Sequence, residues 1–324
     1  MRVIQSICGK TASKEVNAGE KFFRYGAYYQ LVASLLAFIL LAITGFYGFN
    51  LQTAVCAVAS ALLFIVELYT NIQSMKGAPL TVCTMFSLGG LVVSCAGGMV
   101  LFGESVTIAQ AGGLIAFLVG AYLLVSKGKN GGEKINPRTY VSLLINLLTN
   151  GLIMVVQKYF SVKVQGGNVL LFSFLTFLLN AVIMASCVAC MALKRHNRAM
   201  KKNYGGGNRH GSENNYSEEE THGEAQENNI ESEIKEKPQK EIFGLSKTLI
   251  ICGALLALAL FAINYLVTEL GKTVDSVILF PVSSAISIGI TAIVGWCFFK
   301  EKLTIKNLSG LIVGLAGIIV IGVC

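Results

Sequence analysis

The stretch that decides the fold is LTVCTMFSLGGLVVSCAGGMVLFGESVTIAQAGGLIAFLVGAYLLVS, residues 80–126, which contains a single charged side chain, Glu104. Runs of about 20 residues with few charges are long enough to cross the hydrocarbon core of a bilayer as helices, which satisfy their own backbone hydrogen bonds. The short break around Glu104 divides this stretch into two such runs. In the whole chain 54% of the residues are hydrophobic and 14% are charged. We therefore predict an all-α fold, a polytopic membrane helix bundle.

The rest of the chain repeats this pattern and gives nine predicted spans in total. Their expected limits are 27–48, 52–71, 80–102, 107–126, 139–160, 168–193, 248–268, 276–298 and 307–323. Within these limits only Glu67 and Lys158 carry a charge, whereas helices that face water carry a charged outer face. We expect an integral, multi-pass protein of the bacterial inner membrane, although the same architecture occurs in eukaryotic organelles.

Basic residues predict the orientation of the spans. Of the 26 lysines and arginines, 23 fall on one side of the predicted topology and 3 on the other. The positive-inside rule then places the polar segment 194–247 in the cytoplasm and the carboxyl terminus outside.

The polar segment 194–247 is rich in Asn, Gly, Glu and Lys and has too few apolar residues to form a core, so we predict a disordered loop. A solvated spacer is favoured over a regulatory or partner-docking segment.

The two halves of the chain resemble each other. At an offset of 197 residues the matched pairs are Ser87 and Ser284, Gly98 and Gly295, Phe102 and Phe299, Glu104 and Glu301, Thr107 and Thr304, Gly113 and Gly310, and Gly120 and Gly317. A weaker match at an offset of 148 pairs Lys10 with Lys158, and the polar segment accounts for the difference between the offsets. The two matched connections fall on opposite sides of the membrane, so we predict two inverted repeats of about five helices.

These repeats define the expected domain organisation. Residues 1–126 form the first repeat, 127–193 the start of the second, 194–247 the polar loop, and 248–324 the rest of the second repeat. Few residues precede Lys10, whereas its counterpart Lys158 lies late in a full span. We therefore hypothesise a tenth span at the beginning of the chain whose first half is truncated.

Two stretches resemble a known family. Leu101-Phe102-Gly103-Glu104, followed by Thr107, Gln110, Gly113 and Gly120, resembles the conserved end of an EamA domain of the drug/metabolite transporter superfamily. So does the stretch from Pro281 through Phe298-Phe299-Lys300-Glu301-Lys302-Leu303-Thr304, followed by Gly310 and Gly317. The resemblance implies ten helices in two inverted repeats around a central cavity, and the transport of amino acids, nucleotide sugars, organic phosphates or drugs. The truncated first helix, the long loop and the external carboxyl terminus depart from the family pattern.

Polar side chains within the spans are the candidate solute-binding residues. Asn146, Asn150 and Gln157 share one face of a predicted helix and form a plausible cavity wall. Ionisable groups in a membrane are costly, so Glu67 and Lys158 are candidates too, although each could instead extend to the interface. The remaining candidates are Tyr69, Asn71, Asn180, Asn264, Tyr265, Ser283 and Ser284. For the polar groups, hydrogen bonding between helices is the alternative.

The repeat relation suggests where these groups lie and which motif residues are structural. Lys10 and Glu67 are expected near one mouth of a pore, and Lys158 and Asn264 near the other, so each half could pair a cation with an acid or an amide. Pro281 is a candidate hinge or a static kink. The structural motif residues are Glu104, Glu301, Gly113 and Gly310, where the two acids are expected to cap helix starts.

No cluster of catalytic or metal-ligating residues is evident, so we expect neither an enzyme nor a cofactor nor a metal site. The three histidines, His196, His210 and His222, all lie in the polar segment. We expect a secondary transporter that moves a small polar solute by alternating access, with the solute and the lipid bilayer as its partners and no nucleic acid. A non-transporting scaffold or inactive fragment is the alternative, followed by a membrane-embedded transferase, and a homodimer is left open.

Overall fold

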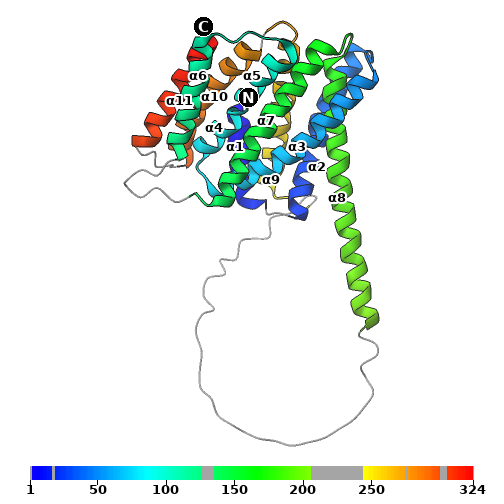
Figure 1. The fold of residues 1–324 in the computed structure, drawn as a ribbon. Coiled ribbons are helices and arrows are strands. Elements are labelled where there is room, and N and C mark those ends of the chain that lie inside the picture. The colour runs from blue at the N-terminus through cyan, green and yellow to red at the C-terminus, as the bar shows by residue number, and fades with distance from the viewer. Residues whose placement is uncertain are drawn as a thin grey trace, which may run out of the picture.

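The computed structural model describes residues 2–16, 19–125, 135–205, 244–274, 276–299 and 305–323. These residues form helices and no strand. The helices are α1 (Arg2–Glu15), α2 (Glu20–Thr44), α3 (Leu51–Gly77), α4 (Leu80–Leu88), α5 (Gly90–Phe102), α6 (Ile108–Val125), α7 (Pro137–Lys163), α8 (Val169–Gly205), α9 (Lys247–Leu270), α10 (Ser276–Phe299) and α11 (Ile305–Val323). They pack into one bundle from which the last part of α8 projects (Figure 1). The predicted all-α class is confirmed.

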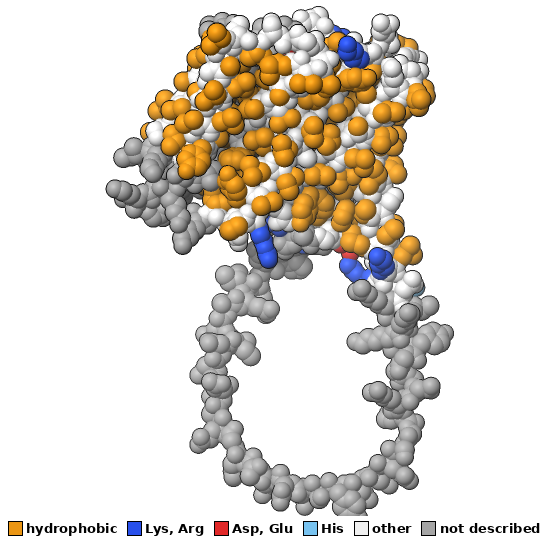
Figure 2. Space-filling model, in the orientation of Figure 1, with side chains coloured by type: hydrophobic (Ala, Val, Ile, Leu, Met, Phe, Trp, Pro, Cys, Tyr) orange, Lys and Arg blue, Asp and Glu red, His pale blue; other side chains and the backbone are white. Residues whose placement is uncertain are grey.

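Six of the described helical segments are long and apolar enough to cross a membrane: α2, α3, α4 with α5, α7, α8 and α9. The other three predicted spans coincide with α6, α10 and α11. The outer surface is apolar, and Val100 and Trp296 are 82% and 65% exposed. Figure 2 shows hydrophobic side chains over the face of the bundle, with Lys and Arg near its two ends. So large an apolar surface marks an integral membrane helix bundle.

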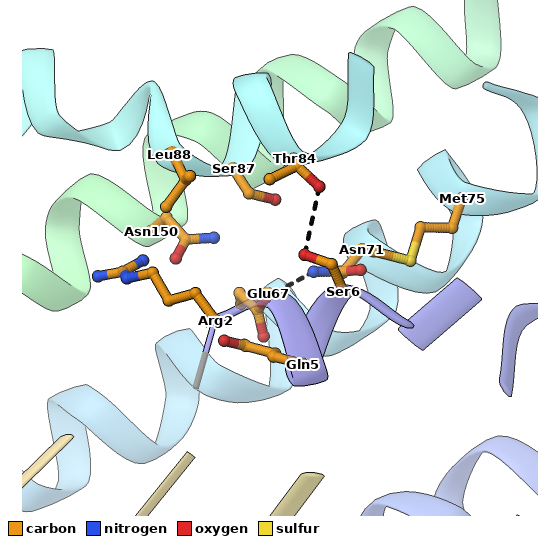
Figure 3. Close-up of a pocket in the computed structure, with 10 residues that line it drawn as sticks. All are labelled: Arg2, Gln5, Ser6, Glu67, Asn71, Met75, Thr84, Ser87, Leu88 and Asn150. Atoms are coloured by element: carbon orange, nitrogen blue, oxygen red, sulfur yellow. Dashed lines mark hydrogen bonds between the residues drawn. The ribbon is translucent and has the colours of Figure 1, made fainter. Parts of the chain in front are cut away.

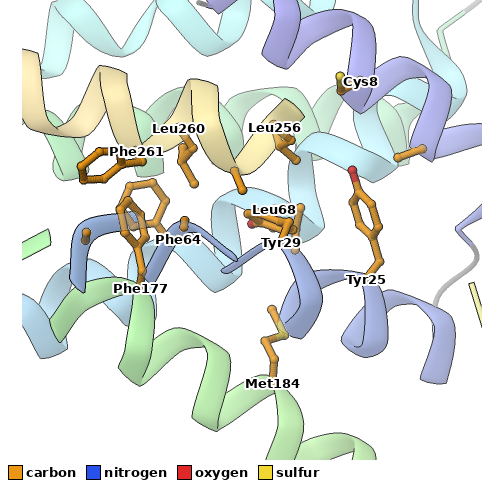
Figure 4. Close-up of a cluster of buried hydrophobic side chains, with 14 of the residues drawn as sticks. Cys8, Tyr25, Tyr29, Phe64, Leu68, Phe177, Met184, Leu256, Leu260 and Phe261 are labelled. Carbon is orange, nitrogen blue, oxygen red and sulfur yellow. The ribbon is translucent and has the colours of Figure 1, made fainter. Parts of the chain in front are cut away.

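Two main clusters of buried side chains hold the bundle together. One lies between α4, α5, α6, α10 and α11 and contains Met85, Leu91 and Phe117. The other joins α1, α2, α3, α8 and α9 around Tyr29 and Phe177 (Figure 4). Leu, Phe and Met fill these regions at close packing, so the polar groups that remain inside the bundle stand out against them.

Helices α6 and α11 touch through their backbones. A Cβ atom added to Gly113 would lie 2.6 Å from the Gly317 carbonyl oxygen. One added to Gly120 would lie 2.6 Å from the Gly310 carbonyl oxygen and 2.5 Å from the Gly314 nitrogen. Small residues commonly allow such close approach between membrane helices.

The start of the predicted loop at residue 194 is wrong, because α8 continues as a helix to Gly205. The prediction placed this start where apolar residues stop, but helix formation does not require apolar side chains. Ala, Met, Lys and Arg in this extension are good helix formers, and no Gly or Pro interrupts them before Gly205. The rest of the predicted loop, 206–243, lies outside the described residues.

Residues 2–15, expected to be the remaining part of a first helix, form α1. This helix contacts α3 and α9. Its first residue, Arg2, lines a pocket together with residues of α3, α4 and α7. The start of α1 therefore lies inside the bundle, beside helices that are long enough to span a bilayer.

Candidate functional site

A pocket opens between α1, α3, α4 and α7 (Figure 3). It contains about 360 Å³ of space free of protein atoms, part of it open to the surroundings. Its lining residues are Arg2, Gln5, Ser6, Glu67, Asn71, Met75, Thr84, Ser87, Leu88 and Asn150. Apart from Met75 and Leu88 these side chains are polar, in contrast to the apolar clusters on either side.

Glu67 of α3 is the buried acid of this pocket, with 6% of its surface exposed. Its Oε1 accepts a hydrogen bond of 2.9 Å from the Asn71 amide, one turn further along the same helix. Asn150 of α7 also interacts with this carboxylate. The sequence-predicted residues Glu67, Asn71 and Asn150 are thus brought together from two helices.

Arg2 supplies the opposite charge. Its guanidinium interacts electrostatically with Glu67, yet no ion pair or hydrogen bond joins Arg2 to any other residue in the described part of the chain. The sequence analysis missed Arg2 because it precedes the first apolar span. A signal did exist, since the offset of 148 residues places Arg2 opposite Asn150, which also lines the pocket.

Asn146 lies beside the pocket and connects its walls. Its amide donates to the Glu67 carbonyl at 3.3 Å and to the Thr70 hydroxyl at 3.4 Å, and its oxygen accepts from Ser87. These bonds link α7 to α3 and α4. Asn146 therefore positions the helices that carry Glu67 and Asn150.

Gln157 lies elsewhere, although it shares the predicted face with Asn146. Its amide donates to the Asn264 oxygen at 2.7 Å, a contact between α7 and α9. Asn180 similarly donates to the Ala61 carbonyl at 3.4 Å and connects α8 to α3. Gln157, Asn264 and Asn180 therefore form hydrogen bonds between helices and do not line the pocket.

The other predicted solute contacts also lie away from this pocket. Tyr69 is 46% exposed and packs edge-on against Phe22. Tyr265 stacks on Phe261 between apolar clusters, and Ser284 is buried in α10. The side chain of Ser283 lies outside the described residues, as does that of the candidate hinge Pro281, whose backbone belongs to α10.

Lys158 does not extend to the interface, because only 6% of its side chain is exposed. Its ammonium lies 3.3 Å from the Glu104 carboxylate and donates a 2.8 Å hydrogen bond to the Val274 carbonyl. This ion pair joins α7 to the connection between α5 and α6. Neither Lys158 nor Glu104 lines the pocket.

The predicted capping role of Glu104 is therefore wrong, and Thr107 caps α6 instead. The Thr107 N–H donates to the Gln110 side-chain oxygen at 2.9 Å, while the Gln110 N–H donates to the Thr107 hydroxyl at 3.2 Å. This reciprocal pair is a capping box, which satisfies the free N–H groups of the first turn. Glu301, the counterpart of Glu104, lies outside the described residues.

Lys10 does not contact Glu67, contrary to the expected pairing. Its ammonium donates to the carbonyls of Met75 and Ala78 at 2.7 and 2.8 Å. Both carbonyls belong to the end of α3, where a cation is favoured by the helix dipole. Lys158 and Asn264 do not pair either, because Lys158 contacts Glu104 and Val274, whereas Asn264 accepts from Gln157.

Comparisons with known proteins show the fold and nothing more specific. No family model matches the chain, and no curated protein matches it. A crystal structure of another protein covers 98% of this chain and 92% of its own length, with a TM-score of 0.57 and 11% sequence identity. The arrangement of helices along nearly the whole chain is therefore one that a solved structure shares.

Proposed function

We propose that this protein is a secondary transporter of the drug/metabolite transporter superfamily, which moves a small polar solute across a bilayer by alternating access. The observation that carries the proposal is the pocket, which presents Arg2 and Glu67 inside a bundle with an apolar exterior. Ionisable groups within a membrane are costly and are commonly found where a substrate or ion passes.

Reciprocal contacts between α6 and α11 support the proposed inverted repeats. At the offset of 197 residues Gly113 corresponds to Gly310, and Gly120 corresponds to Gly317. In the structure Gly113 contacts Gly317, and Gly120 contacts Gly310. If each glycine is replaced by its counterpart in the other repeat, the first contact becomes the second. Two copies related by a two-fold axis make contacts of this kind.

Lys10 and Lys158 give a second line of support. They correspond at the offset of 148 residues, and each donates to carbonyls at the end of a helix: α3 for Lys10 and the turn after α9 for Lys158. The ends of α3 and α9 in turn correspond at the offset of 197 residues, which matches Gly77 with Val274. Both lysines thus donate to a carbonyl at corresponding places in the two halves, which supports the repeat.

The charge bias supports the orientation that we propose, with the connection between α8 and α9 in the cytoplasm and with a bacterial inner membrane as the location. We further propose that the protein performs transport without covalent chemistry on the solute. In an alternating-access cycle the two halves rock about the pocket, which then opens to one side at a time.

Uptake into proteoliposomes tests the proposal. Purified protein is offered labelled amino acids, sugar nucleotides and organic anions, with and without an imposed ion gradient. Asn150→Ala removes an amide from the pocket, whereas Asn197→Ala changes an exposed residue of α8 and is the matched control. We expect accumulation by the wild type and the control, and a loss of roughly tenfold or more in Asn150→Ala.

The absence of any accumulation from protein that is folded and inserted would refute transport and would favour a scaffold. Equal uptake by Asn150→Ala and the wild type would instead place the solute path away from this pocket. The melting temperature of each variant in detergent serves as the check on folding.

A further inference from the structure

We propose that the pocket takes a small zwitterion, a molecule that carries both an ammonium and a carboxylate group, such as an α-amino acid with a neutral side chain. This inference rests on the proposed transport function and names its substrate class. Its basis is that Glu67 from α3 and Arg2 from α1 face one pocket without forming an ion pair (Figure 3).

The ammonium end would bind at Glu67. A carboxylate can accept about four hydrogen bonds. Asn71 provides one of these at 2.9 Å, and the amides of Asn150 and Asn146 also interact with the carboxylate. Because the side chain is 6% exposed, water can satisfy little of the remaining capacity, and a buried charge without a partner is costly. An ammonium group has three donors and the opposite charge, so it matches this site.

The carboxylate end would bind at Arg2. A guanidinium presents five N–H donors in a planar fork, which matches a carboxylate through two parallel hydrogen bonds. The described residues leave these donors unused, since Arg2 has only a longer-range electrostatic interaction with Glu67. In Figure 3 the guanidinium of Arg2 points away from the Glu67 carboxylate, on the side of the pocket where Asn150 is drawn.

The remaining lining selects against further charges. Gln5, Ser6, Thr84 and Ser87 carry neutral polar groups, and the Thr84 hydroxyl donates to that of Ser6 at 3.2 Å. A second carboxylate or amine on the solute would therefore find no counter-charge.

A solute with a single charge fits less well. An organic anion at Arg2 would leave Glu67 without a partner and would be repelled by it, and an amine at Glu67 would leave Arg2 in the same position. Specificity then follows from repulsion as much as from attraction. A zwitterion is the solute class that pairs both charges at once.

Matched ligands test this with the wild-type protein alone. L-Alanine, propionate and ethylamine differ by the loss of one charged group, and their binding to purified protein in detergent is measured by calorimetry. Glycine, L-serine and L-glutamine are measured in the same way. We expect saturable binding of at least one zwitterion, roughly thirtyfold or more tighter than either single-charge compound. Equal binding of propionate or ethylamine, or no binding of any zwitterion, overturns the inference.

Variants test whether Arg2 binds the carboxylate of the solute and Glu67 its ammonium group. Arg2→Gln and Glu67→Gln are compared with Arg138→Gln, at an exposed arginine, and with Glu269→Gln, at a partly exposed glutamate that pairs with Lys272; both controls lie outside the pocket. Each pocket variant should weaken zwitterion binding by roughly thirtyfold, while each control binds as the wild type does. Arg2→Gln should shift the relative preference toward ethylamine, and Glu67→Gln toward propionate. A merely structural role would weaken all ligands equally, and that result contradicts the inference.

The outcomes separate this inference from the transport proposal. Zwitterion binding without uptake into proteoliposomes would refute transport and leave the zwitterion site standing. Uptake of a sugar nucleotide or an organic anion, without zwitterion binding, would support transport and overturn the zwitterion site.

Discussion

The close backbone contact between α6 and α11 gives a sharp prediction for Gly120→Ala. The new methyl group would lie 2.5 Å from the Gly314 nitrogen and 2.6 Å from the Gly310 carbonyl oxygen. These distances are about 0.8–0.9 Å short of ordinary contact, which begins at 3.4 Å. Because the atoms that it meets are backbone, α6 and α11 must move apart. Overpacking of this kind costs about 1–3 kcal/mol.

Gly112→Ala is the matched control, since a methyl group at Gly112 of the same helix meets nothing within 4 Å. Ala is a better helix former than Gly, by about 0.8–1.0 kcal/mol in water, so this variant should be neutral or slightly stabilised. The free energy of unfolding is measured by titrating SDS into detergent micelles. Equal stability of the two variants would refute the close α6–α11 contact.

Three further predictions follow from the contacts above. Lys158→Met removes the ammonium that pairs with the buried Glu104 carboxylate and should lower stability by about 3–5 kcal/mol, whereas adding Glu104→Gln should recover part of this loss; the same SDS titration measures both. Thr107→Ala removes one half of the capping box of α6 and should cost about 1 kcal/mol, with no change in ligand affinity. If the connection between α8 and α9 is cytoplasmic, a cysteine introduced as Ser212→Cys in a cysteine-free background should react with an impermeant maleimide only from the cytoplasmic side, and labelling from outside would reverse the topology.

The spans could be predicted from the sequence because the membrane imposes a simple constraint. Glu67 and Lys158 are the only charges within nine apolar runs, and each run coincides with a helix or, at residues 80–102, with the pair α4 and α5. The end of α8 could not be predicted in this way. Hydropathy reports where a helix leaves the apolar region, whereas the backbone continues to Gly205 under its own helix propensity.

The site was predicted in part. Glu67, Asn71 and Asn150 line the pocket, because polar groups in apolar helices are costly and tend to gather. Gln157 obeys the same periodicity but bonds to Asn264, since periodicity gives a face and not the neighbour that the face meets. Arg2 was missed because it lies in a helix too short to register as a span.

The treatment of buried charges separates the pocket from the rest of the bundle. Away from the pocket, Lys158 has a carboxylate and a carbonyl as partners, and Lys10 has two carbonyls. At the pocket, Arg2 and Glu67 both line the cavity and do not form an ion pair. Two cations inside the bundle, Lys158 and Lys10, are thus compensated by groups of the protein itself. Arg2 and Glu67 do not neutralise each other in this way. A solute with both an ammonium and a carboxylate group would supply a partner to each of them, which is the physical reason to test zwitterions first.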